Sequence, residues 1–185
     1  MTEIRKTISV FGSSAPRPGD ETYDLARAVG RLLAEAGFAV ATGGYAGTME
    51  AVSRGAAEAG GHVIGVGAQR IEQFRPGGLN DWVMEEVQYE TLQERVLHLV
   101  RRNDGMIVLP GGIGTLSELA LAWSFLQVGE IERRPLVLLG DIWRETMEAF
   151  IHSKFVREPH AALLHYAGSP EEAVAFVREK VDAPS

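Results

Sequence analysis

Two glycine-rich segments hold the residues of this sequence that could bind and transform a phosphorylated molecule. They cover residues 42–50 (TGGYAGTME) and residues 110–118 (PGGIGTLSE), and each lies between a short apolar run and a stretch with helical spacing. Glycine lets the backbone turn tightly and lie close to a ligand, and the start of the following helix offers unpaired N–H groups and a partial positive charge. Both segments therefore predict phosphate binding.

The second segment also carries a candidate catalytic carboxylate, Glu118. The stretch 116–128 that contains it is apolar on all sides, and a carboxylate in such surroundings is costly unless it has a partner or a task. One task is to stabilise the positive charge that develops on a sugar ring when a glycosidic bond breaks. The alternative is structural, because Thr115 and Glu118 have the spacing of a capping box at a helix N-terminus.

Arg95 is the candidate cation, and it lies fifteen residues before Pro110. It sits on the edge of the apolar stripe of a helix predicted over residues 90–103, so its charge either meets the ligand or extends into solvent along an apolar surface. Arg70 and Arg75 lie in a loop predicted over residues 67–82, which either folds over a ligand or stays in solvent. The histidines have no paired ligand spacing, so we expect neither a metal site nor a Ser-His-Asp triad.

An alternation of strands and helices must position these groups. Strands are predicted over residues 7–11, 38–41, 62–66, 83–87, 106–109, 135–139 and 163–166, and helices over residues 20–36, 48–59, 90–103, 115–128, 143–155 and 170–181. The strands are apolar runs without polar alternation, which is typical of a parallel sheet covered on both faces. We therefore predict an α/β fold: one Rossmann-like domain over residues 1–185, with a doubly wound parallel sheet, helices on both faces and a disordered tail at residues 181–185.

The order of the elements also predicts where a ligand binds. In sheets of this kind the ligand lies at the carboxyl ends of the strands. Three predicted strand ends carry small, turn-forming residues, at positions 12–14, 43–44 and 111–112. We expect these three turns to converge on one crevice.

The composition excludes several classes of function. The chain has 185 residues, of which 45% are hydrophobic, and a net charge of −7, which argues against nucleic acid as the main partner because backbone binding requires a basic surface. The sequence contains no cysteine, so disulfides and thiolate sites are excluded. No apolar run approaches the roughly 18 residues that span a membrane, and no signal peptide precedes the first strand, so we expect a cytoplasmic protein without membrane association.

The motif at residues 110–118, together with residues 43–49 and Gly12-Ser13-Ser14, resembles the Lonely Guy (LOG) family, and the resemblance extends over about residues 8–155. The best-known members hydrolyse cytokinin riboside 5′-monophosphates to free base and ribose 5-phosphate. The resemblance implies a hydrolase that takes a nucleoside 5′-monophosphate of the AMP or cytokinin type, needs no cofactor and forms a homodimer or a higher homo-oligomer.

An older label for such proteins, lysine decarboxylase, does not fit this sequence. A pyridoxal enzyme needs a lysine that forms a Schiff base with the cofactor. Only Lys6, Lys154 and Lys180 occur, and all three lie outside the glycine-rich segments.

The resemblance also implies roles for individual residues. Glu118 is implied as the catalytic carboxylate, and Arg95 as the arginine that helps to bind phosphate and is needed for activity. The implied phosphate- and substrate-binding residues are Gly111, Gly112, Gly114, Thr115, Ser13, Ser14, Gly43, Gly44 and Met49.

This sequence departs from the family pattern in the helix before the second segment. The enzymes carry a His-x-Arg-Lys pattern at Arg95; here Gln93 takes the place of the histidine and Val96 that of the lysine. One cation expected near the phosphate or the base is therefore missing. The alternatives to hydrolysis are a non-catalytic nucleotide-binding or molybdenum-cofactor carrier protein, as exists among family relatives, and a nucleotide sensor with its ligand at a dimer interface.

Overall fold

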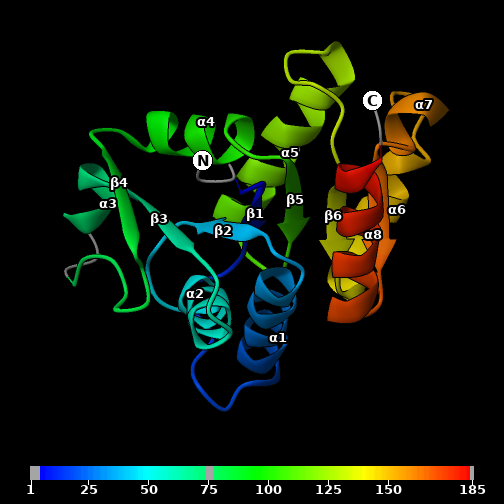
Figure 1. The fold of residues 1–185 in the computed structure, drawn as a ribbon. Helices are drawn as coiled ribbons and strands as arrows, with labels where there is room; N and C mark the ends of the chain where they lie inside the picture. Colours follow the sequence, from blue (N-terminus) through cyan, green and yellow to red (C-terminus); the bar gives the residue numbers. More distant parts are fainter. Residues whose placement is uncertain (1–4, 74–76, 184–185) are drawn as a thin grey trace.

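The computed structural model describes residues 5–73 and 77–183, so the predicted loop residue Arg75 lies outside the described residues. Its centre is a parallel sheet with the strand order β4-β3-β2-β1-β5-β6-β7 (Figure 1). The strands are β1 (Thr7–Phe11), β2 (Ala39–Thr42), β3 (Val63–Ala68), β4 (Glu85–Tyr89), β5 (Gly105–Val108), β6 (Leu136–Leu139) and β7 (Leu164–Ala167). Every neighbouring pair in the described sheet is parallel. From β1 to β4 each new strand is added on one side of β1, and from β5 to β7 on the other side, so the strand order reverses between β1 and β5.

Helices cover both faces of this sheet. In Figure 1, α1 (Glu21–Glu35) and α2 (Thr48–Glu58) lie below the strands, and α4 (Leu92–Arg101) and α5 (Ile113–Val128) lie above them. The strands bury alternate residues on the two sides: Ile8 and Val10 pack with α1, α2 and α8 (Pro170–Asp182), whereas Phe11 packs with α4, α5 and α6 (Asp141–Ile151). The predicted doubly wound α/β fold is confirmed.

Several element boundaries differ from those predicted. The segment predicted as a loop over residues 67–82 begins with the last residues of β3 and a short helix, α3 (Gln69–Glu72). The helix predicted over residues 143–155 ends at Ile151, and a separate turn, α7 (Glu158–Ala161), follows it. At the C-terminus, α8 ends at Asp182, one residue after the predicted end of the helix and inside the segment 181–185 that was expected as a tail; residues 184–185 lie outside the described residues.

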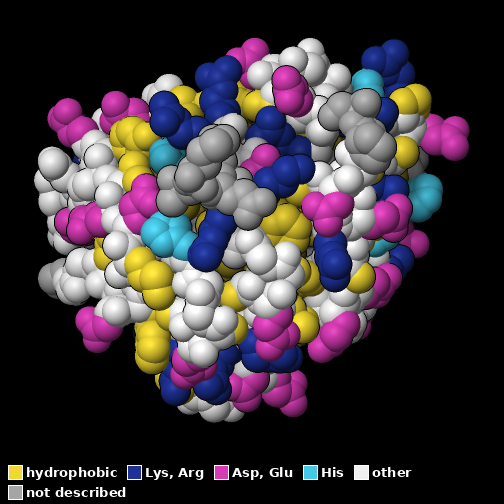
Figure 2. All heavy atoms as spheres, viewed as in Figure 1, with side chains coloured by type: hydrophobic (Ala, Val, Ile, Leu, Met, Phe, Trp, Pro, Cys, Tyr) yellow, Lys and Arg dark blue, Asp and Glu magenta, His cyan; other side chains and the backbone are white. Residues whose placement is uncertain are grey.

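One edge of the sheet is polar. β4 exposes the side chains of Glu85, Glu86 and Gln88, and Glu85 pairs with His62 at 2.8 Å between Oε2 and Nε2. On the face drawn in Figure 2, acidic and basic side chains are intermixed.

None of the helices in the described ranges combines the length and hydropathy needed to cross a bilayer.

Candidate functional site

A cavity of about 660 Å³ opens at the carboxyl end of the sheet, next to the point of reversal between β1 and β5. Parallel α/β sheets bind their ligands at this position. Eight of the site residues expected from the sequence line it: Ser13, Ser14, Met49, Arg95, Gly112, Gly114, Thr115 and Glu118. The loops that follow β1, β2 and β5 therefore converge on one cavity.

The N-terminus of α5 forms one wall of this cavity. The helix begins at Ile113, after the N-cap residue Gly112, and no side chain caps it. Gly112 and Gly114 have no left-handed backbone conformation, and a Cβ built on either would meet no atom within 4 Å. Neither turn geometry nor packing thus requires glycine at these positions. The two glycines leave open space at the start of α5, and the N-terminus of a helix favours an anion because its first N–H groups have no partner within the helix.

The start of α5 also removes the structural alternative for Glu118. Because Gly112 is the N-cap, Thr115 is the third residue of α5 and Glu118 the sixth, so the capping box considered from the sequence is wrong. A capping box forms instead at the start of α4, where Thr91 accepts from the Glu94 N–H at 3.2 Å and Glu94 accepts from the Thr91 N–H at 3.0 Å. This box fixes the first turn of the helix that carries Arg95.

Glu118 and Arg95 form a buried ion pair at the cavity. The residues are only 7% and 6% exposed, and Arg95 Nη1 lies 3.7 Å from Glu118 Oε1. Burial raises the pKa of Glu118 to about 7, although the positive charge of Arg95 acts in the opposite direction. A carboxyl group with this pKa exchanges its proton near neutral pH, as a general acid or base must. The solvent-extended alternative for Arg95 is wrong, because its side chain is buried.

The surroundings of Arg95 explain why residue 43, in the first glycine-rich segment, is a glycine. Arg95 Nε donates to the Val66 carbonyl oxygen at 2.8 Å, and Nη2 lies 3.9 Å from Met49 Sδ. A Cβ on Gly43 would lie 1.8 Å from Nη2 and 2.6 Å from that sulfur. Gly43 therefore does not line the cavity itself; the absence of a side chain there leaves the space that the Arg95 guanidinium occupies.

Gly44 and Gly111 also stand outside the cavity lining. Gly44 has a left-handed φ of 75°, and its carbonyl oxygen accepts from the Asn80 backbone and side-chain amides at 2.7 and 2.8 Å. A Cβ on Gly111 would lie 2.2 Å from Thr115 Oγ1. The backbone of Gly44 therefore anchors the 77–82 segment, and the missing side chain at Gly111 lets Thr115 approach closely.

Six further residues line the cavity: Arg70, from the segment considered as a cover over the ligand, Gly12, from the first converging turn, and four that the sequence did not single out, Tyr45, Ile71, Leu92 and Ile113. Arg70 lies on α3 rather than in a loop, and Tyr45 lies inside the first glycine-rich segment. Position in that segment was the one available signal for Tyr45. Tyr45, Ile71, Leu92 and Ile113 add apolar side chains to a lining that also contains charged groups.

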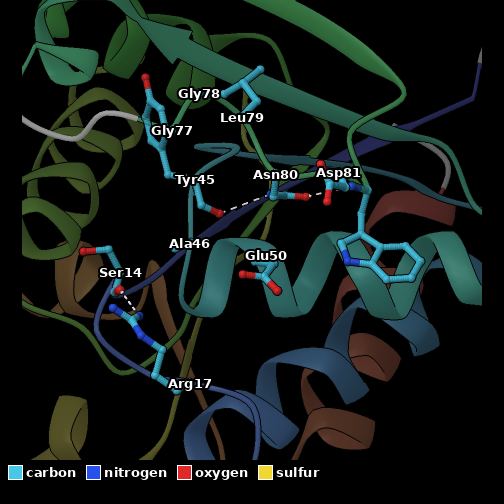
Figure 3. A pocket seen from close by; sticks show the side chains of 11 residues that line it. Ser14, Arg17, Tyr45, Ala46, Glu50, Gly77, Gly78, Leu79, Asn80 and Asp81 are labelled. Carbon is cyan, nitrogen blue, oxygen red and sulfur yellow. Dashed lines mark hydrogen bonds between the residues drawn. The ribbon is translucent and has the colours of Figure 1, made fainter.

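A second cavity, of about 580 Å³, lies beside the first and shares Ser14 and Tyr45 with it. Figure 3 shows Glu50 of α2 between the β1–α1 loop and the 77–82 segment, where Asn80 bonds to the backbone of residue 45. Glu50 Oε1 accepts from the Tyr23 hydroxyl at 3.0 Å. Within residues 5–73 and 77–183, no three His, Cys, Asp or Glu side chains gather as a metal site would require.

Known proteins resemble this chain in sequence and in fold. The model of the SLOG cluster4 family matches residues 5–174. The cytokinin riboside 5′-monophosphate phosphoribohydrolase of Mycobacterium tuberculosis is 33% identical over 138 residues, which cover 74% of this chain and 71% of the relative. The cytokinin riboside 5′-monophosphate phosphoribohydrolase LOG of Oryza sativa subsp. japonica is 30% identical over 182 residues, with coverage of 95% and 74%. The molybdenum cofactor binding protein of Rippkaea orientalis superposes with a TM-score of 0.74 at 26% identity and covers 95% of this chain and 96% of its own.

Proposed function

The chain belongs to the LOG family, within the group whose model is called SLOG cluster4. From that premise we propose that it hydrolyses the N-glycosidic bond of a nucleoside 5′-monophosphate. The products are the free base and ribose 5-phosphate. The observation that carries this proposal is the buried Arg95–Glu118 pair beside the uncapped N-terminus of α5. A carboxylate and an anion site on one cavity wall are the two groups that this reaction needs.

The phosphate binds at the N-terminus of α5 in this proposal. Gly112, Gly114 and Thr115, all at the start of α5, line the cavity, and the first N–H groups of a helix have no partner within the helix. Arg95 and Arg70 add positive charge to the lining. Val96, which replaces the family lysine, packs against the apolar cluster under α4 and α5. Arg70 on α3 lines the cavity, and we assign it the role of the missing cation.

Glu118 acts on the sugar in this proposal. Hydrolysis breaks the bond between C1′ and the base nitrogen, adds the hydroxyl of water to C1′ and leaves the proton with the base. Positive charge develops on the ribose ring as the bond breaks, and an ionised carboxylate beside C1′ stabilises it and orients the water. The raised pKa of Glu118 lets the same group take up and release the proton near pH 7.

The apolar surface of α5 and α6 supports a homodimer. Ile113 and Val128 of α5 are 80% and 69% exposed, and Phe150 of α6 is 54% exposed. A groove of about 570 Å³ runs between the two helices. Exposed apolar surface of this kind marks an association site, and we propose that a second copy covers it. Light scattering of a protein that stays at the 20.1 kDa of one chain would contradict the dimer.

The first test is turnover. Purified protein is incubated with AMP, the other nucleoside monophosphates and isopentenyl-AMP, and free base is separated by chromatography. We expect release of base from at least one monophosphate, no release from the matching nucleoside, and none from Glu118→Gln, which still binds ribose 5-phosphate. Glu145→Gln, an exposed position on α6, is the matched control and keeps full activity. Full activity of Glu118→Gln would contradict the assigned role.

The second candidate is a carrier that binds without turnover. Its support is the superposition on the molybdenum cofactor binding protein of Rippkaea orientalis at 26% identity, together with Val96 in place of the family lysine. This candidate predicts tight binding of a phosphorylated pterin and no free base from any nucleotide. Turnover of one monophosphate decides in favour of the hydrolase.

A further inference from the structure

Tyr45 lies at the cavity, and the proposed reaction gives it no role. Its residue is only 4% exposed, and its ring lines the cavity that contains Glu118. The centroid of the ring lies 5.6 Å from Cζ of Arg95, which places the guanidinium at cation–π distance. Tyr45 therefore contacts the partner of the proposed catalytic carboxylate.

The hydroxyl of Tyr45 is fixed to the end of β3. It accepts from the Ala68 N–H at 2.9 Å and donates to the Ala68 carbonyl oxygen at 3.3 Å. Burial raises the pKa of the Tyr45 phenol, so the hydroxyl keeps the proton that it donates. Two bonds to one backbone residue hold the ring in place more firmly than apolar contact would.

The same strand also holds Arg95. Its Nε donates to the Val66 carbonyl oxygen, two residues before Ala68 on β3. At Gly43 the guanidinium fills the place that a side chain would take. Arg95 thus meets β3, Gly43 and the Tyr45 ring, and Nη1 faces Glu118 at 3.7 Å.

We propose that Tyr45 is a positioning residue: its ring, fixed to the end of β3, keeps the Arg95 guanidinium against the Glu118 carboxylate. This inference rests on the proposed function, which makes Glu118 the group that acts on substrate. Tyr45 touches neither substrate nor water in this role, and it acts through Arg95. Removal of the ring lets Arg95 turn away from Glu118 and into the cavity.

The charged and titratable groups around Glu118 give this movement a measurable direction. Arg95 of α4 faces Glu118, Arg70 of α3 lines the same cavity, and Glu72 of α3 lies behind Tyr45, with Oε1 3.5 Å from the hydroxyl. α5 has no acidic residue in its first turn. Arg95 is the neighbour that lowers the pKa of Glu118. Loss of its contact raises that pKa, whereas simple entry of water would lower it.

The test follows the carboxyl group itself. Protein labelled with carbon-13 at the glutamate carboxyl is titrated by NMR, and the Glu118 signal is assigned by its absence in Glu118→Gln. We expect Tyr45→Leu to move the titration about one pH unit upward. Tyr45→Phe, which keeps the ring and loses the hydroxyl, moves it less in the same direction. In an Arg95→Met background, Tyr45→Leu adds no further shift, because the tyrosine acts through the arginine.

The matched control is Tyr166→Leu. Tyr166 of β7 also stacks with an arginine, with Arg144 Cζ 5.1 Å from its ring, but outside the cavity lining. It leaves the Glu118 titration unchanged. An unchanged or downward titration in Tyr45→Leu would overturn the proposal, and so would a further shift in the Arg95→Met background. The titration needs no turnover, so a failure of the hydrolase assignment is seen separately, as absence of free base from the wild type.

Discussion

Two pairs of glycines show how differently the two faces of the sheet use the missing side chain. On one face, Gly30 of α1 and Gly55 of α2 let the helices pack backbone to backbone: a Cβ on Gly30 would lie 2.1 Å from the Val52 carbonyl oxygen, and one on Gly55 2.0 Å from that of Arg27. On the other face, Gly112 and Gly114 have nothing within 4 Å of a built Cβ. Other protein atoms occupy the space beside Gly30 and Gly55, whereas the space beside Gly112 and Gly114 is open. Space that the protein leaves open at a helix N-terminus is space for a ligand.

The charges of the two faces differ in the same way. Arg27 and Arg54 pair with Glu58 where α1 meets α2, and these side chains are a third or more exposed, so the pairs add little to stability. Arg95 and Glu118 pair in a buried setting, where an ion pair is costly to form and its ionisation is shifted. The packing of α1 on α2 therefore serves stability, whereas at the α5 end of the cavity a buried charge lowers stability and provides a group for the reaction.

The largest effect that we expect comes from the cost of burying Glu118. Its pKa rises from 4.5 in the unfolded chain to about 7 in the folded protein, so the folded state binds the extra proton between these values and stability falls as the pH rises through this window. The loss amounts to about 3 kcal/mol. Urea unfolding at pH 5 and pH 8 should show it in the wild type and not in Glu118→Gln. Equal pH dependence in both proteins would contradict the buried carboxyl.

The next largest effect should come from Gly43→Ala, which should lower the catalytic rate. Gly43 has no left-handed φ, so alanine fits the backbone, yet its methyl group would occupy the position of Arg95 Nη2. Displacement of the guanidinium by about 1 Å should lower kcat about a hundredfold. Steady-state kinetics on the best substrate measure this effect, with Gly168→Ala as the control: this exposed glycine lies outside the cavity lining, and a Cβ there would approach only Glu172 Oε2, at 3.5 Å. Unchanged kcat would mean that Arg95 tolerates displacement.

Gly30→Ala should act on stability alone. The methyl group forces α1 away from the Val52 carbonyl, and overpacking of this kind costs about 2 kcal/mol. The urea midpoint should fall, while kcat and KM of the folded protein stay at the wild-type values. A loss of activity without a loss of stability would break the division between the two faces.

Gly114→Ala should give the smallest change in stability, and of opposite sign. Alanine favours a helix over glycine by about 1 kcal/mol, and the built Cβ meets no protein atom, so the urea midpoint should rise. The methyl group intrudes on the space for phosphate, so affinity for ribose 5-phosphate should fall about tenfold, the equivalent of about 1.4 kcal/mol. Calorimetric titration measures it. A variant that is both more stable and equally tight would remove the phosphate from this helix.

The sequence predicted the fold well where a strand is an apolar run. β1, β5 and β6 are of this kind and lie within about one residue of their predicted positions. β4 does not have this pattern, because an edge strand has one side free for polar residues, and it lies two residues later than predicted. α3 and α7 are single turns of four residues, too short for a helical period to be visible in the sequence.

The candidate site was predicted by its loops and not by its side-chain directions. Thr115 and Glu118 follow a glycine motif, so their place at a strand end could be inferred. Tyr45, Ile71 and Leu92 line the cavity because of the way that turns and helix starts point them, and a one-dimensional pattern does not contain that direction. The capping-box error had the same origin, since the sequence alone did not show that Gly112 begins α5.

The polar edge of the sheet has a consequence for how copies of this protein meet. An exposed edge strand presents unpaired backbone groups that can add a strand from a neighbouring molecule. On β4, Glu85 and Glu86 are both exposed and point to opposite faces of the sheet, so two approaching edges bring like charges together on either face. Sheet-to-sheet growth into fibrils is opposed at this edge by electrostatic repulsion that salt will screen. Concentrated stocks at high ionic strength are therefore where this barrier is lowest.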